Sequence, residues 1–175
     1  MLYLKSKKMK KIIYRNGLLG GLFVSTTMII TTVFMKANPG AEPNMVLGFS
    51  SMFLSFLFVI IGIKQQESFK DSENSFWNSF KIGLFISAII STIYVLVWLV
   101  IYYNFYPEFM ENYSDIVLKN TKPEELAAKT LEMEQMKEAY KNPMFVVLYT
   151  YFEVFPLGIL VSLITPTITL VKQKL

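Results

Sequence analysis

The sequence predicts an all-α fold, an integral membrane four-helix bundle with an extracytoplasmic amphipathic helical hairpin between the third and fourth spans. Three observations predict this class. Hydrophobic residues make up 53% of the 175 residues and charged residues only 17%, which is more apolar surface than a soluble domain of this length can bury. Four apolar segments are long enough to cross a bilayer. Lysines gather in alternate connections, as they do in membrane proteins of defined orientation.

Each of the four segments has about the 20 residues that cross roughly 30 Å of hydrocarbon at about 1.5 Å per residue. The first three contain no charged residue. Together with an outer helical segment at 104–143 they account for a single membrane domain, residues 1–175. The predicted spans cover residues 16–35, 44–63, 82–103 and about 145–171.

A cleaved signal peptide is the alternative interpretation of the first span, because a basic segment precedes an apolar one. The apolar run is longer than that of a usual signal peptide, and Pro39 lies inside any cleavage window. We therefore predict that the first span is retained.

Basic residues predict the orientation, because positively charged connections are held on the cytoplasmic side. Six of the 17 basic residues lie in the first fifteen positions, three lie between the second and third spans, and two lie in the tail. The first connection has only Lys36, and the segment from Asn104 to Pro143 has five lysines against eight acids. We expect both termini on the cytoplasmic side.

The residue types exclude much enzyme chemistry. The chain has no cysteine and no histidine, so it lacks a thiolate nucleophile, the commonest metal ligand and the usual acid or base near neutral pH. The sequence also has no glycine-rich phosphate loop, catalytic carboxylate pair or Ser-Lys dyad. We predict a non-enzymatic protein without a cofactor, and no nucleic-acid partner, because the basic residues serve to orient the spans.

Small residues four positions apart predict close helix packing in every span, because helices in lipid associate through backbone approach. Residues with this spacing share one face of a helix. The sets are Gly17 with Gly21, Ser51 with Ser55, Gly83 with Ser87 and Ser91, and Gly158 with Ser162. We expect a compact bundle, and the sequence leaves open a homo-oligomer that uses some of these faces.

The outer segment predicts two amphipathic helices. Pro107 can open the first, which carries Glu108 on its polar face. Thr121 to Glu124 has the spacing of a capping box and predicts the start of the second. Because the apolar stripes must be buried, we expect this hairpin either to close the bundle or to bind a protein partner through residues 107–142.

Glu153 is the one ionisable residue inside a predicted span, and intramembrane carboxylates usually face protein or water and mark function. Pro156 lies three residues later, removes an amide hydrogen and can kink the helix. Two interpretations stay open. The glutamate is interfacial or lysine-paired beside a structural kink, or it is the working residue of a small transporter or ion- or proton-conducting subunit.

Aromatic residues gather toward the outer end of the third span, where the belts of membrane proteins lie. Ordinary anchoring in the interface explains such a cluster, and a cage that stacks on a ligand is the alternative. Membrane lipid is therefore one expected partner. The cluster comprises Tyr94, Trp98, Tyr102, Tyr103 and Tyr106.

The order of these features resembles the four-pass bacterial membrane proteins catalogued as domain of unknown function family 4199. One departure is that Gln65 to Ser68 stands where the family pattern is expected to carry an arginine. The resemblance implies the bacterial cytoplasmic membrane and no assigned activity. The matching pieces are Lys10-Lys11 followed by Gly17 to Gly21, Gly62-Ile63-Lys64, Phe80 to Leu84, Pro107 to Met110 with Tyr113, Tyr140 to Pro143, and Glu153 to Gly158.

Overall fold

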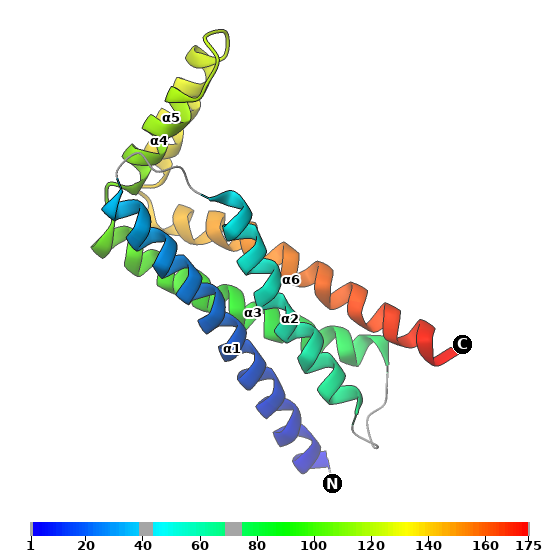
Figure 1. Ribbon diagram of the computed structural model, residues 1–175. Coiled ribbons are helices and arrows are strands. Elements are labelled where there is room, and N and C mark those ends of the chain that lie inside the picture. The colour runs from blue at the N-terminus through cyan, green and yellow to red at the C-terminus, as the bar shows by residue number, and fades with distance from the viewer. Residues whose placement is uncertain (1, 39–43, 69–74, 175) are drawn as a thin grey trace.

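The computed structural model describes residues 2–38, 44–68 and 75–174 (Figure 1). These residues form six α-helices and one short π-helix and contain no strand, which confirms the predicted all-α class. The elements in chain order are α1 Leu2–Ala37, α2 Met45–Glu67, α3 Phe76–Val100, η1 Ile101–Phe105, α4 Phe109–Lys119, α5 Leu126–Ala139 and α6 Pro143–Lys174.

Four helices are long and apolar enough to cross a membrane, which confirms the predicted number of spans. The helices run beyond the predicted apolar segments, because lysine, arginine and glutamine are good helix formers and hydrogen bonding continues past the last apolar residue. The apolar stretch of a sequence therefore marks the part of the helix that meets hydrocarbon. It does not mark the residue at which the helix ends. The spanning segments are Lys7–Ala37, Met45–Glu67, Phe76–Phe105 and Pro143–Thr169.

Helices α2 and α3 lie at the centre of the bundle. They pack against each other, and each also packs against α1 and α6, which flank them (Figure 1). The first turns of α1 and α3 and the last turns of α2 and α6 lie at one end, here named the terminal end. The opposite end carries α4 and α5 and is named the hairpin end.

The small residues predicted to mediate packing are all buried, which confirms that prediction. A Cβ added to Gly17 would lie 2.7 Å from Cγ2 of Ile89, and one added to Gly21 would lie 2.5 Å from Cδ1 of Ile93. Both contacts have the same register, so α1 and α3 run parallel with their backbones in close approach. On the other side of α3, the hydroxyl groups of Ser87 and Ser162 lie 3.3 Å apart.

Large apolar side chains fill the middle of the bundle. Phe56, Val59, Ile86 and Val154 belong to one cluster, and each has an exposed fraction of 1% or less. Because hydrocarbon is as apolar as these side chains, the cluster is held by dispersion contacts at close packing rather than by exclusion of water. The bundle is therefore solid through its middle.

Helices α4 and α5 form an antiparallel hairpin (Figure 1). Its base is buried, where Met110 of α4 packs with Tyr102, Tyr140 and Val146. Its tip projects away from the spanning helices (Figure 1). The base of the hairpin alone therefore covers the ends of the spans.

The α3 helix ends in a π-helical turn, η1, which sequence reasoning did not predict. The amide of Tyr106 donates to the carbonyl of Ile101 at 2.7 Å, which closes the wider turn. A π-turn inserts one extra residue and so shifts the side chains that follow it around the helix. This shift helps to bring Tyr106 inward, with an exposed fraction of 4%.

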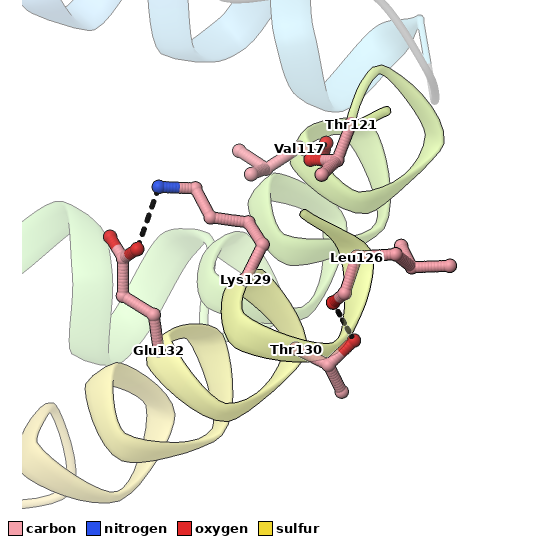
Figure 2. Close-up of polar contacts among 6 residues, drawn as sticks. All are labelled: Val117, Thr121, Leu126, Lys129, Thr130 and Glu132. Carbon is pink, nitrogen blue, oxygen red and sulfur yellow. Dashed lines mark hydrogen bonds and ion pairs between the residues drawn. The ribbon is translucent and has the colours of Figure 1, made fainter. Parts of the chain in front are cut away.

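The predicted capping box at Thr121 to Glu124 is wrong. The hydroxyl of Thr121 donates to the carbonyl of Val117 at 2.7 Å, so it satisfies the end of α4 instead of the start of α5. Helix α5 begins later, at Leu126, whose carbonyl accepts from the Thr130 hydroxyl (Figure 2). A hydroxyl group close to two helix ends can form a hydrogen bond with either of them. The position of the threonine in the sequence does not show which bond it forms.

Candidate functional site

A cavity of about 390 Å³ lies at the hairpin end, and all six α-helices contribute to its walls. Its volume is within the range of about 300 to 1,000 Å³ that small-molecule sites occupy. Helices α1, α2, α3 and α6 form the sides, and α4 and α5 add residues from the base of the hairpin. We name this space the hairpin-end cavity.

Among the residues that the structure describes, Glu153 supplies the only charged side chain in the lining of the hairpin-end cavity. It lies on α6 between Thr150 and Val154, which are both buried against the bundle, while its own side chain is exposed to the cavity. Among the side chains that the structure describes, in residues 7–38, 44–68 and 75–169, no group donates a hydrogen bond to its carboxylate and no lysine or arginine pairs with it. The expected lysine partner is thus not found in this part of the chain.

Aromatic rings form much of the wall around Glu153. Trp98 packs edge-on against Phe109, with ring centroids 4.9 Å apart. Tyr140 packs edge-on against Tyr149, with centroids 5.9 Å apart. Edge-to-face pairs of rings are energetically favourable, and the cavity wall is therefore built of rings that pack on one another.

The hydroxyl of Tyr140 stays neutral at physiological pH. Burial is the main cause that raises the pKa of Tyr140 above its usual range, and the nearby Tyr149 and Glu153 raise it further. Tyr140 lies just after α5, outside the spanning segments. It therefore offers the cavity a neutral ring and a hydroxyl group, and no second negative charge.

Methionines are concentrated in the same lining, which holds six of the ten in the chain. A thioether is polarisable and flexible, so it adapts to apolar ligands of different shape and makes favourable contacts with rings. The six are Met28, Met35, Met45, Met52, Met110 and Met136.

Lys36 is the basic residue at the hairpin end of α1, and its side chain does not contact Glu153. Its ammonium group donates to the carbonyl of Phe105 and lies 4.5 Å from the centroid of the Phe105 ring. It is not part of the cavity lining. Lys36 therefore does not pair with Glu153.

The structure separates the four candidate residues that the sequence singled out. Glu153 lines the cavity, and Tyr102 lies behind the wall, packed edge-on against Tyr140 at 5.5 Å between ring centroids. Pro156 is exposed on α6 outside the lining, and α6 continues through it. Glu108 is exposed at the start of α4, where its side chain makes no capping hydrogen bond.

Sequence reasoning missed a cluster of buried amides at the terminal end. Asn16 is 1% exposed and donates to the carbonyl of Ile12 at 2.9 Å and to the side chain of Gln65 at 3.0 Å. Gln66 is 3% exposed and accepts from the hydroxyl of Ser79 at 3.1 Å. These bonds join α1, α2 and α3. The adjacent Gln65 and Gln66 at the end of an apolar run were the sequence signal from which this cluster could have been predicted.

Fold and composition together define a multi-pass membrane protein with four spanning helices. Residues 15–169 match the family described as Protein of unknown function (DUF4199), and the chain belongs to that family. This confirms the resemblance seen in the sequence. No curated protein and no solved structure matches the chain.

Proposed function

We propose that the protein is a non-enzymatic membrane binding protein whose hairpin-end cavity takes a small organic cation with an apolar body. The unpaired carboxylate of Glu153 among aromatic rings carries this proposal. A carboxylate in such surroundings is costly unless a cation or water compensates it. A cationic ligand supplies that compensation directly.

The wall favours an organic cation over a metal ion or an anion. A cation above a ring of Trp or Tyr gains about 0.5 to 2 kcal/mol per ring, and Trp98, Tyr140 and Tyr149 offer such rings. The six thioethers suit an apolar body. A single carboxylate provides too few hard ligands for calcium or magnesium, and it repels anions.

The proposed setting is the bacterial cytoplasmic membrane with both termini in the cytoplasm, so that the cavity faces outward. The excess of basic residues at the terminal end supports this orientation. Because the chain has no cysteine, cysteines placed at the exposed Ala127 and Ser68 test it. An impermeant thiol reagent should label the first in intact cells and not the second.

The hairpin has two proposed roles. Its base closes the cavity, since residues of α4 and α5 belong to the lining. Its tip, which projects from the bundle, is the surface through which residues 107–142 bind a protein partner (Figure 1). Deletion of the tip, residues 120–125 between α4 and α5, should then abolish co-purification of that partner in mild detergent while cation binding is retained.

A small transporter is the second candidate, favoured by the position of Glu153 in a spanning helix. The packed middle of the bundle weighs against it, because Phe56, Val59 and Val154 fill the core with exposed fractions of 1% or less. Flux of the cation into proteoliposomes that Glu153→Gln abolishes would favour transport. Saturable binding without flux would favour the binding protein.

The two tryptophans of the chain permit a direct binding test. Trp98 lines the cavity, while Trp77 lies near the terminal end with an exposed fraction of 63%. In a Trp77→Phe background, fluorescence reports on Trp98 alone. We expect benzyltrimethylammonium to change this fluorescence saturably, and its uncharged isostere neopentylbenzene to bind at least about tenfold more weakly, equivalent to about 1.4 kcal/mol.

Glu153→Gln removes the charge and keeps the shape, and it should weaken cation binding by about tenfold or more. Glu108→Gln is the matched control, because it makes the same change at an exposed site outside the cavity and should have no effect. Equal cation affinity in Glu153→Gln and in the unsubstituted protein would falsify the proposal.

A further inference from the structure

We propose that a groove between α1 and α3 at the terminal end binds one anionic phospholipid. The groove has a volume of about 1,000 Å³ and is lined by residues of α1 and α3, with Gln66 of α2 at its side. It runs along α3 from the terminal end to Ile93, shares no lining residue with the hairpin-end cavity and does not depend on the function proposed for that cavity.

Two lysines define the polar end of the groove. Lys10 comes from α1 and Lys81 from α3, and both line it. The parallel register of Gly17 with Ile89 places residue 10 level with residue 82, so the two lysines lie at the same height. Neither has an ion-pair partner among the described side chains of residues 7–38, 44–68 and 75–169. Two unpaired ammonium groups at one height form a site for a phosphate.

The rest of the groove is apolar, and its length fits a lipid chain. Its lining on α3 extends from residue 78 to Ile93, which corresponds to roughly 22 Å at about 1.5 Å per residue. One leaflet accounts for about half of the roughly 30 Å hydrocarbon core. The groove therefore accommodates one acyl chain and still reaches the headgroup region at the lysines.

A phospholipid is a better occupant than free phosphate or a second copy of this chain. Free phosphate would leave the apolar side chains of Ile13, Leu18 and Phe85 without a partner. A second copy would have to bring an acid to the lysines, whereas the described ends of α1, α2 and α3 nearby carry Glu67 as their acid, and Glu67 already accepts from Ser79 at 3.2 Å. Basic sites between helices at the cytoplasmic side are typical binding sites for anionic headgroups.

Native mass spectrometry of the full chain, purified in mild detergent and supplied with equal amounts of phosphatidylglycerol and phosphatidylcholine, tests the proposal. We expect one phosphatidylglycerol to be retained in preference to phosphatidylcholine by at least about fivefold. The double variant Lys10→Gln/Lys81→Gln should lose this preference, and Lys10→Arg/Lys81→Arg should keep it, because the charge is restored.

Lys7→Gln/Lys64→Gln is the matched control. It removes two exposed lysines from the terminal end that do not line the groove, and it should retain the lipid. Equal loss in this control would overturn the proposal, because general charge would then explain binding. Equal retention of both lipids, or displacement of the lipid by millimolar inorganic phosphate, would also overturn it. The arginine variant guards against loss of folding as the cause.

Discussion

The terminal half of the bundle and its hairpin end are built on the same four spanning helices, yet the seams between the helices differ. Glycine and serine line the seams of the terminal half, where Gly62 and Gly83 bring backbones together and Ile63 has no exposed surface. At the hairpin end, aromatic and methionine side chains surround a cavity of about 390 Å³. Close contacts therefore hold the seams of the terminal half, apart from the surface groove between α1 and α3, whereas the helices of the hairpin end surround a space.

This difference shows that the size of the side chains on a helix face determines whether two helices pack closely or leave space for a binding site. Small residues allow helices in lipid to approach until dispersion contacts hold them. Large rings keep the helix ends apart and leave space that only a ligand, lipid or water can fill. One charged residue in that space then determines which ligand is favoured.

The largest effect is expected from Phe56→Ala. Phe56 is 1% exposed in the packed middle of the bundle, so truncation leaves a cavity and should cost about 3 to 5 kcal/mol of unfolding free energy. Phe49→Ala is the matched control at the hairpin-end cavity, where the ring is 48% exposed and its loss should cost far less. Equilibrium unfolding in mixed micelles measures both, and equal costs would mean that the hairpin end is packed as closely as the middle of the bundle.

An intermediate effect is expected from Gly158→Ala. The added Cβ would lie 2.5 Å from Cβ of Ser87 and 2.7 Å from the Phe56 ring, so α6 and α3 must separate. Overpacking of this kind costs about 1 to 3 kcal/mol, and the thermal unfolding midpoint in detergent should fall. An unchanged midpoint would mean that α6 does not approach α3 this closely.

The smallest effect is expected from Gly48→Ala, and it has the opposite sign. Gly48 lies on α2 beside the hairpin-end cavity, and an added Cβ would have no neighbour within 4 Å. Replacing a helical glycine by alanine without strain stabilises by about 0.5 to 1 kcal/mol. The midpoint should therefore rise slightly. A fall would reveal a packed seam where the structure shows open space.

Much of the bundle could be predicted from the residues because its causes are local in the chain. Hydrocarbon requires long apolar helices, and close approach requires small residues at a spacing of four. Both signals can be read without knowing which helix is the partner. The threonines of α6 are a further local case, since Thr165 donates to the carbonyl of Val161, one turn earlier in the same helix, at 2.8 Å.

The candidate site could be predicted only in part. Glu153 stood out because a charge in a span is rare, but nothing near it in the chain indicates Trp98 or Met28 as neighbours. The wrong capping box has a different cause. The hydroxyl of Thr121 lies between the end of α4 and the start of α5, and its spacing in the sequence does not show that it bonds to Val117 of α4.

The sequence by itself determined that the protein crosses a membrane four times, which faces of its helices pack closely, and that no thiol or imidazole chemistry is available. The tertiary structure alone decided that Glu153 faces a ring-lined cavity, and that Lys10 and Lys81 lie level with each other. The reason is that the two kinds of feature depend on interactions over different distances along the chain. Transfer into hydrocarbon acts on each segment separately, whereas a cavity exists only where several segments meet and fail to fill the space between them.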